Sequence, residues 1–353
     1  MNKPINYPPI NLSSVRPGEK IQVPGVMDVI PGAGEPVYVT NYGNLIPTFH
    51  GVLTDDNVLI EETSYIGLYP TNSDDRPIIL SNIQKSRRIN HGNQEKVVVL
   101  TNHWDQNYQH FLMETLPRLH LLITSFSVDI PIILTDARHI RDIVGILYPD
   151  QNFIFLSGGQ GFDQPVECIT ISYVQKNLGR IHPLCIAAMR ELRNKVIEIS
   201  RKENIEPSSL VSAQSVSIGR RTDNSNSGSA RIMINQSEYT EYLNNAGYSE
   251  VFLEDYNLIQ KARVLSSAKT IITPLGANIM NLMFADSAER IFLIPHKLAF
   301  WSPAWFIEFI KLMCTSAKSV EVIECVTIHD GPHKFNKPFS VEIEALGKAI
   351  NNY

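Results

Sequence analysis

The sequence predicts an α/β protein with two Rossmann-like domains, and three observations lead to this prediction. From residue 96 onward, short apolar runs alternate with longer segments of helical periodicity. A polar segment with Pro, Ser and Gln, 203–217, interrupts the alternation, which then resumes. A chain of 353 residues is long for one core and natural for two α/β domains. We therefore expect domains over residues 1–205 and 206–330, followed by a tail over 331–353 that returns to brace the N-terminal domain.

The first domain is expected to begin with short strands and loops. Residues 1–94 are rich in Pro, Gly, Asn and Asp, with short β-branched stretches at 37–40 and 58–60. The apolar run 96–100 then predicts a buried strand. The elements expected after it are a helix at 107–124, a strand at 130–134, a helix at 137–147, strands at 153–156 and 168–174, and a helix at 183–202.

The alternation of predicted strands and helices is clearer in the second domain. Asn235 and Glu238 have the spacing of a capping-box-like helix start, and Gly247 fits the C-terminal end of that helix. Residues 276–278 form a tight turn that opens a further helix. The remaining elements expected here are strands at 215–219, 248–253, 270–272, 290–294 and 320–325, helices at 258–268, 304–314 and 341–350, and a polar loop at 222–230. This alternation predicts a parallel sheet wound by helices.

Bulk composition excludes several classes of function. The net charge of −5 gives no support for a nucleic-acid-binding face. The four cysteines lie far apart without a C-x-x-C pair, which argues against a zinc site and against a disulfide scaffold. We found neither an apolar stretch of transmembrane length nor a secretory signal pattern. These patterns predict a cytoplasmic protein that associates at most peripherally with the inner face of a membrane, and they leave monomer and homo-oligomer open.

The segment from Asn107 to Leu119 is the first that contains candidate catalytic or ligand-binding side chains. On a regular helix Asn107, His110, Glu114 and Arg118 share one face, and Pro117 would kink or break that helix. The face is either solvent-exposed with i,i+4 pairs, or it lines a cleft. In a cleft, His110 or Glu114 could remove a proton from a hydroxyl, and Arg118 could hold an anion or orient Glu114. Two further candidates precede this helix, His103 and Asp105.

A second group of candidates follows the predicted strands of the second domain. Arginines near the carboxyl end of a parallel strand are well shaped for phosphate oxygens, although solvated surface charge is the alternative. Small residues at a strand-to-helix turn let the backbone approach a diphosphate. Asn281 in the following helix could bind a ligand or only nearby backbone. The candidates for donor binding are Arg220, Arg221, Arg231, Gly276, Ala277, Asn278 and Asn281.

Together the two groups resemble glycosyltransferase family 61. The first segment matches the family pattern through Asn107, His110, Glu114, Leu116, Pro117, Arg118 and Leu119. The second half matches it through Arg220 or Arg221, then Arg231, Asn235, Gln260, Ala268, Gly276, Ala277, Asn281 and Phe284. The order and spacing agree over about residues 95–315.

The resemblance implies a GT-B fold, in which two Rossmann-like domains face a cleft, and an inverting, metal-independent hexosyl- or pentosyltransferase. A nucleotide diphosphate sugar, such as a UDP-sugar, would be the donor, and no cofactor or metal would be needed. A glycan or lipid-linked glycan in surface polysaccharide (capsule) biosynthesis would be the acceptor. His110 and Glu114 would be the catalytic residues, Asn107, Arg118 and Asp105 would bind or orient the acceptor, and the second domain would hold the donor.

The chain also departs from the family pattern. The usual His before Gly276 is Leu275, the second Gly is Asn278, and the next strand ends in Phe292, Leu293 and Ile294 rather than an acid. These departures leave open a catalytically weak member that binds a glycan or nucleotide as an assembly protein. An unrelated α/β enzyme such as a dehydrogenase is a third reading, but the sequence lacks a glycine fingerprint for it.

Overall fold

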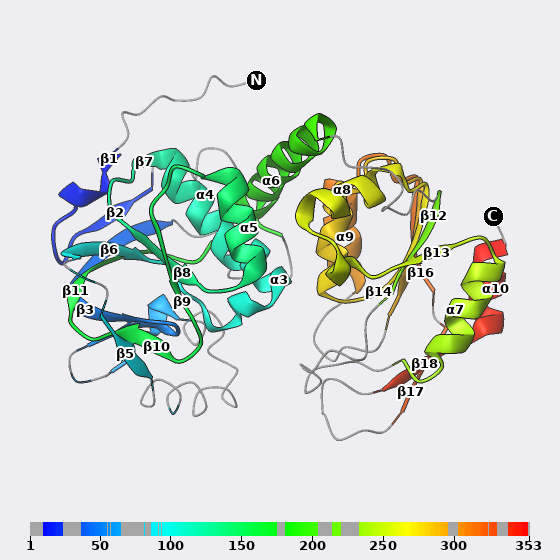
Figure 1. Cartoon of the computed structure of the whole chain (residues 1–353), viewed down its shortest axis with the longest axis horizontal. Coiled ribbons are helices and arrows are strands. Elements are labelled where there is room, and N and C mark those ends of the chain that lie inside the picture. The colour runs from blue at the N-terminus through cyan, green and yellow to red at the C-terminus, as the bar shows by residue number, and fades with distance from the viewer. Residues whose placement is uncertain are drawn as a thin grey trace. The chain divides into compact units, whose positions relative to one another are not determined.

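A computed structural model shows a chain of two compact units, residues 1–192 and 193–353 (Figure 1). It describes residues 10–23, 37–54, 56, 58–64, 81, 86–90, 92, 94–174, 181–203, 214–219, 233–295, 303–323, 325–329 and 338–351. The division falls inside helix α6 (Pro183–Lys202), whereas the expected boundary lies just after this helix, at 205. Both units mix helices and strands, so the predicted α/β class is confirmed.

Unit 1 contains a sheet of nine described strands. Its path runs β5-β10-β3-β11-β6-β8-β9, and β2 and β4 each pair with β3. A separate parallel pair is formed by β1 (Ile10–Asn11) and β7 (Phe126–Ser127). The strands of the sheet are β2 (Lys20–Gln22), β3 (Tyr38–Thr48), β4 (Gly51–Leu53), β5 (Arg87–Ile89), β6 (Lys96–Val99), β8 (Ile132–Thr135), β9 (Phe153–Leu156), β10 (Gln160–Phe162) and β11 (Val166–Ile171).

The half of this sheet formed by β11, β6, β8 and β9 is parallel. The valines of β6 and all four residues of β8 are buried, because helices and the antiparallel strands cover both faces of the sheet. The predicted strands at 96–100 and 153–156 are therefore confirmed. The strand expected at 168–174 begins and ends earlier, as β11, so that Tyr173 lies beyond its carboxyl end.

The N-terminal region contains a longer β-strand, β3, than its composition predicts. β3 spans 11 residues although Tyr42-Gly43-Asn44 lies in its middle. The irregularity is absorbed where the register between β3 and β11 shifts, and the Asn41 side-chain oxygen there accepts the N–H of Gly43 at 2.9 Å. The stretch at 58–60 contributes only an isolated bridge from Leu59 to Leu53.

The helices of unit 1 follow the predicted order. The expected helix at 107–124 is present, but it consists of three helical segments, one of them π-helical. The segments are η1 (Leu12–Ser14), η2 (Glu61–Thr63), η3 (His103–Gln106), α3 (Tyr108–His110), the π-helical turn η4 (Phe111–Thr115), α4 (Leu116–Ser125), α5 (Arg138–Leu147) and the first part of α6.

Unit 2 contains a parallel five-stranded sheet among its described residues, in the order β13-β12-β14-β15-β16. This is the doubly wound order 2-1-3-4-5, in which the connections leave the first strand toward opposite edges of the sheet. A hairpin of β17 (Val326–Ile328) and β18 (Phe339–Val341) accompanies it. The strands are β12 (Ser215–Ile218), β13 (Ser249–Val251), β14 (Thr270–Pro274), β15 (Arg290–Ile294) and β16 (Ser319–Val322).

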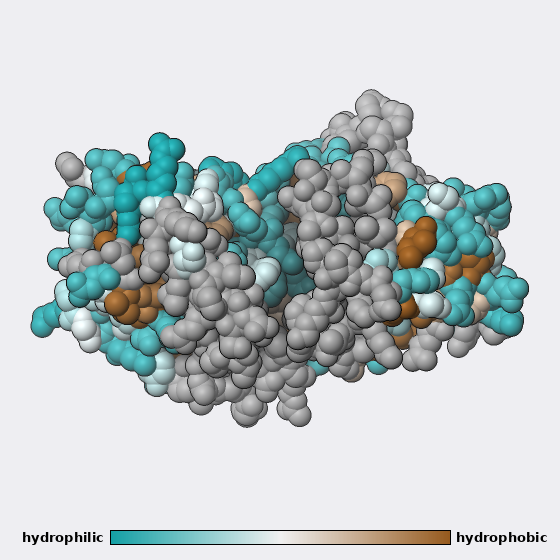
Figure 2. All heavy atoms as spheres, turned by 90° about the horizontal axis from the view of Figure 1, so that it is seen from below, coloured by the Kyte–Doolittle hydropathy of each residue, from teal (hydrophilic) through white to brown (hydrophobic). Residues whose placement is uncertain are grey.

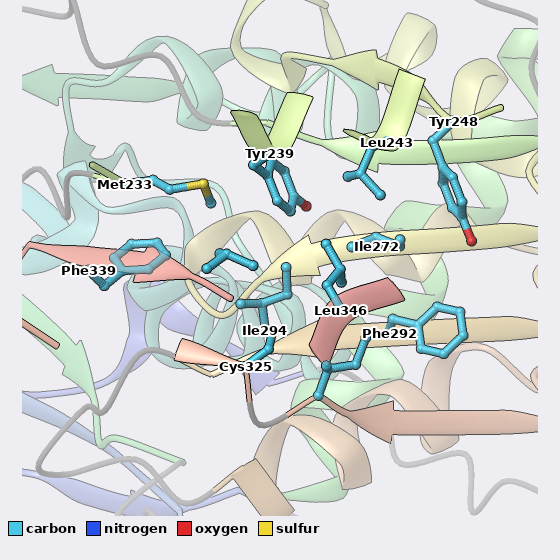
Figure 3. Close-up of a cluster of buried hydrophobic side chains, with 12 residues drawn as sticks. Met233, Tyr239, Leu243, Tyr248, Ile272, Phe292, Ile294, Cys325, Phe339 and Leu346 are labelled. Carbon is cyan, nitrogen blue, oxygen red and sulfur yellow. The ribbon is translucent and has the colours of Figure 1, made fainter. Parts of the chain in front are cut away.

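Helices cover both faces of this sheet, with α8 and α9 on one side and α7 and α10 on the other (Figure 1). On the second side, Tyr239 and Leu243 of α7 point toward Ile272 of the sheet and Leu346 of α10 (Figure 3). Residues 338–351, part of the tail expected to return to the N-terminal domain, thus pack within unit 2. The helical segments are α7 (Gln236–Asn245), η7 (Leu253–Asp255), α8 (Leu258–Ser267), η8 (Ala277–Phe284), α9 (Pro303–Met313) and α10 (Ile343–Asn351).

The surface is mostly hydrophilic where Figure 2 shows described residues. Val58 and Ile234 are the large hydrophobic side chains that stand exposed in the described part of the chain. Within that same part, we find no helix with the combination of length and apolar character that crossing a bilayer requires.

Candidate functional site

The candidate site of unit 1 forms where three neighbouring parallel strands end. Asn102 follows β6, Thr135 is the last residue of β8, and Tyr173 follows β11. These strands are adjacent in the sheet, so their carboxyl ends share one edge. This edge is where open α/β sheets bind ligands, because the loops and helix starts that follow the strands gather there.

The Glu114 carboxylate is the best-anchored group at this edge. Asn102 Nδ2 donates to Glu114 Oε2 at 2.6 Å, and His110 Nδ1 lies 2.7 Å from Glu114 Oε1. The Glu114 side chain is 3% exposed, while that of His110 is 18% exposed. Both carboxylate oxygens are therefore engaged by side chains, and the imidazole is the member of the pair that reaches toward solvent.

A π-helical turn, Phe111–Thr115, carries Glu114. Its cause is visible in the sequence, because Pro117 has no N–H and cannot bond the carbonyl of Met113. That carbonyl instead accepts the thiol of Cys185 at 3.3 Å. The prediction that Pro117 perturbs the helix is confirmed, in the form of a π turn followed by α4 with Pro117 in its first turn. Such turns are frequent at functional sites.

Asn107 does not join the predicted face. It caps α3, its side-chain oxygen accepts the N–H of Gln109 at 3.0 Å, and the residue is exposed. The π turn also changes the angular spacing on which the shared face of Asn107, His110, Glu114 and Arg118 was calculated. His110 and Glu114 remain bonded across it, so the pair at the centre of the predicted face is preserved.

Asp105 lies fully buried in the loop after β6. The Thr115 hydroxyl lies 2.8 and 2.9 Å from its two carboxyl oxygens, and His139 Nε2 donates to its backbone carbonyl at 2.9 Å. Burial raises the pKa of Asp105 well above its ordinary value; the Thr115 hydrogen bond opposes this shift, and the charge of Glu114 adds to it. Asp105 therefore favours its neutral form and holds the loop and the helix together.

Arg118 is 2% exposed, which is unusual for a guanidinium. It lies over the Tyr173 ring, 4.2 Å from the centroid, and its Nε has no hydrogen-bond partner among the described residues. Its positive charge lowers the pKa of Asp105 and that of Tyr173, against the larger effect of burial in both cases. The orientation of Glu114 comes from Asn102 and His110.

Several contributors were missed in the sequence. His103, noted only as a second-rank candidate, stacks on His50 with ring centroids 4.9 Å apart. Burial, and then the charge of His103, lowers the pKa of His50 to about 4. Asn102, Thr135 and Tyr173 are polar residues at or next to the ends of predicted strands, and this position is the signal that could have found them. The residues missed are His50, Asn102, Thr115, Thr135, His139 and Tyr173.

Unit 2 presents a second edge, at the carboxyl ends of β12 and β14. These two strands flank the point where the sheet order reverses, the position at which doubly wound sheets bind ligands. Gly219 follows β12, and Leu275 and Gly276 follow β14. The predicted Arg220, Arg221 and Arg231 lie outside the described residues.

The turn at Gly276 leads into a helix, as predicted, but this helix has 3-10 geometry. Asn281 is buried; its Nδ2 donates to the carbonyl of Asn278 at 3.2 Å, and its Oδ1 has no partner among the described residues. Leu275 is 3% exposed and bonds the carbonyl of Ile294 through its N–H at 2.9 Å. The side chain at the position of the family's usual His thus belongs to the core.

Two family-matched residues perform structural tasks. Gln260 forms a reciprocal capping box with Asn257 at the start of α8, with both bonds at 2.9 Å. Asn235 is the N-cap residue of α7, so the predicted helix start is confirmed, but the expected capping box is absent because neither side chain bonds the helix backbone there; Asn235 Nδ2 donates to Glu238 Oε2 at 3.1 Å. Asn235 instead bonds both backbone groups of Val341, at 2.8 and 2.9 Å, because β18 lies beside it.

Within the described ranges, no group of three or more His, Cys, Asp or Glu side chains is arranged to hold a metal ion. No curated protein matches the chain. The family model of Glycosyltransferase 61 matches residues 108–292, slightly more than half of the chain. This range begins at the helix that carries His110 and Glu114 and ends in β15 of the second sheet. The chain belongs to glycosyltransferase family 61 and is a glycosyltransferase that uses a sugar donor and an acceptor.

Proposed function

We propose that the chain is an inverting, metal-independent glycosyltransferase of GT-B architecture. It transfers a hexosyl or pentosyl group from a nucleotide diphosphate sugar, with a UDP-sugar as the first choice. The acceptor is a glycan or lipid-linked glycan of surface polysaccharide biosynthesis, in the cytoplasm or at the inner face of the membrane. The observation that carries the proposal is the hydrogen-bonded pair of His110 and Glu114.

In this proposal His110 is the general base and Glu114 acts through it. Glu114 has both oxygens engaged and is nearly buried, so it is poorly placed to take a proton from a substrate. Its bond to Nδ1 favours the neutral imidazole with the proton on Nδ1, and we propose that Nε2 takes the proton of the acceptor hydroxyl. When Nε2 takes the proton, the carboxylate stabilises the imidazolium.

The donor is proposed to bind at the β12–β14 edge of unit 2. Gly276 allows close approach of a diphosphate to the backbone at the point where the strand order reverses. Arg220, Arg221 and Arg231, carried over from the family pattern, would balance the charge of the leaving diphosphate. Inversion follows if the acceptor oxygen attacks the sugar opposite this diphosphate.

Transfer assays on two variants test the assignment. Because a positioned base contributes typically 10²–10⁴-fold, His110→Ala should lower kcat by about this factor, and Glu114→Gln should lower it by roughly 10²-fold. The matched control is His120→Ala, since His120 lies in α4 and bonds the Tyr148 hydroxyl, away from Glu114. Assays in excess EDTA test metal independence. Wild-type kcat in His110→Ala would contradict the role of the base, and loss of activity in EDTA would contradict metal independence.

The burial of Leu275 favours a second candidate function. With this side chain in the core, the turn before Gly276 lacks the imidazole that the family pattern places there. A weakly catalytic member that binds a glycan or nucleotide as an assembly protein fits this loss. A panel of UDP, GDP, CMP and TDP sugars decides between the two functions. Robust turnover of any donor removes the second function, and binding of a donor without turnover removes the first.

A further inference from the structure

Cys185 lies in the first turn of α6, and its thiol reaches the π-helical turn that carries Glu114. Cys185 Sγ donates to the backbone carbonyl of Met113 at 3.3 Å, across 72 positions of the sequence. Both residues belong to unit 1, and Cys185 is fully buried. The contact therefore joins the start of α6 to the peptide group that immediately precedes Glu114.

The Met113 carbonyl needs a donor from outside its own helix because of the residue four positions on. In a regular α-helix the N–H of residue 117 would bond this oxygen, but Pro117 has no N–H. A buried carbonyl that loses a donor carries a desolvation cost, and Met113 is only 4% exposed. The thiol of Cys185 thus supplies a hydrogen bond that the proline removes.

This hydrogen bond acts on the backbone that directs Glu114. The Met113 carbonyl and the Glu114 N–H belong to one planar peptide group, so a donor that fixes the carbonyl also fixes that plane. The Glu114 carboxylate must meet Asn102 Nδ2 at 2.6 Å and His110 Nδ1 at 2.7 Å. A rotation of the peptide would move the carboxylate relative to both partners, and a displacement of about 1 Å in an active site can cost on the order of 10²-fold in rate.

The surroundings keep the thiol in its donor form. Burial raises the pKa of Cys185, and the negative charge of Glu114 raises it further, while backbone hydrogen bonds oppose the shift. A thiol with a raised pKa stays protonated and is a poor nucleophile. Cys185 is therefore suited to donate a hydrogen bond and not to react.

We propose that Cys185 is a positioning residue for sugar transfer: its thiol holds the Met113 carbonyl and thereby keeps Glu114 aligned with His110. The inference rests on the proposed function, since it takes His110 as the base. Cys185→Ser and Cys185→Ala separate this role from core packing. Serine retains a donor but buries a more polar group, so packing alone gives it no advantage over alanine, whereas positioning favours serine.

The first test observes the His110–Glu114 bond without any substrate. In the full chain with ¹⁵N-labelled histidine, the Nδ1 proton bonded to the carboxylate gives a downfield proton resonance, and His110→Ala assigns it. The variants are Cys185→Ala, Cys185→Ser and Cys185→Val, in which valine fills the site without a donor. The matched control is Cys168→Ala, because Cys168 is also fully buried in unit 1 and its thiol donates to the carbonyl of Val166 at 3.3 Å.

The resonance should keep its wild-type position in Cys185→Ser and Cys168→Ala, and it should shift or disappear in Cys185→Ala and Cys185→Val. An unchanged resonance in either variant without a donor overturns the inference. Its loss in Cys185→Ser does so as well, because packing and not the donor would then align the pair. A wild type without this resonance overturns the His110–Glu114 pair itself, and the inference with it.

The second test observes the same alignment in the reaction. With a donor found in the panel of UDP, GDP, CMP and TDP sugars, Cys185→Ala should lower kcat about tenfold and leave KM within about twofold, and Cys185→Ser should recover most of this loss. In the Glu114→Gln background, Cys185→Ala should change kcat by less than about twofold, because its effect passes through Glu114. Full additivity of the two substitutions overturns the inference. Turnover of no donor by the wild type contradicts the proposed function, and the imidazole resonance still decides whether Cys185 aligns the pair.

Discussion

The two strand-end edges are built in different ways. At the edge of unit 1, polar side chains bond one another, as Asn102, His110 and Glu114 do, and Asp105 bonds Thr115. At the edge of unit 2, the described residues at the strand ends are Gly219, Leu275 and Gly276.

The difference matches the two tasks that we propose. A base must be held at one tautomer and one orientation, which needs side chains that fix other side chains. A diphosphate can be bound by backbone N–H groups, which needs small residues and close approach instead. Substitutions at the first edge should therefore disturb a hydrogen-bond network, and those at the second should disturb steric fit.

The largest effect on stability is expected at Asp105. Asp105→Ala removes the acceptor of Thr115, which is itself fully buried, and leaves a cavity under the helix that carries Glu114. Together these should lower the free energy of unfolding by about 2–4 kcal/mol. Asp105→Asn is the matched variant and should cost clearly less, because a neutral amide resembles the protonated acid. Denaturant unfolding at pH 6 measures both, and equal loss in the two variants would contradict a neutral Asp105.

The pH dependence of the unfolding free energy gives a second comparison between the wild type and Asp105→Asn. The folded-state pKa of Asp105 is raised above the value of 3.8 expected for the unfolded chain. In the window above 3.8 the folded state retains a proton that the unfolded state loses, so the Asp105 contribution to stability falls as pH rises. Asp105→Asn has no such contribution. Its stability relative to wild type should therefore increase between pH 4 and pH 7, and a constant difference would contradict the raised pKa.

Most elements after residue 96 could be predicted because their local signals agree with the tertiary packing. The strands Phe153–Leu156 and Arg290–Ile294 and the helix Pro183–Lys202 have the predicted bounds. The N-terminal region could not be predicted as well. β3 passes through Tyr42-Gly43-Asn44, a turn-like stretch that is kept extended by pairing on both sides of it, among others with the distant strand β11 at Asn41 and Asn44.

For the candidate site, the residue spacing predicts the contact between His110 and Glu114 but not the residues that surround this pair. His110 and Glu114 stand four apart on one helix, so the sequence alone brings them together. Asn102 and Thr135 come from separate strand ends, and their approach depends on the order β6-β8 in the sheet, which local periodicity does not contain. The capping box at Asn235 failed for a similar reason, since β18 competes for that side chain from 106 positions away.

A smaller effect is expected at the second edge, from Gly219→Ala. The new methyl group would meet Glu250 Oε1 and Phe252 Cε1 at 2.8 Å, and Glu250 is held by two donors and cannot easily move away. Overpacking of this kind should cost about 1–3 kcal/mol in urea unfolding. The control is Gly145→Ala in α5, where nothing lies within 4 Å of the added atom and a gain of about 0.5–1 kcal/mol is expected. Equal responses in the two variants would contradict the steric account.

The smallest effect is expected from Asn235→Ala, and it separates fold from site within unit 2. Asn235 bonds both backbone groups of Val341, and its loss should lower the free energy of unfolding by about 1 kcal/mol. Asn244→Ala, at an exposed position of the same helix, should change it by less than about 0.5 kcal/mol. Nucleotide affinity should stay at the wild-type value in both variants. If Asn235→Ala instead keeps full stability and loses nucleotide affinity, the side chain serves the donor, and the second edge depends on side-chain hydrogen bonds as the first one does.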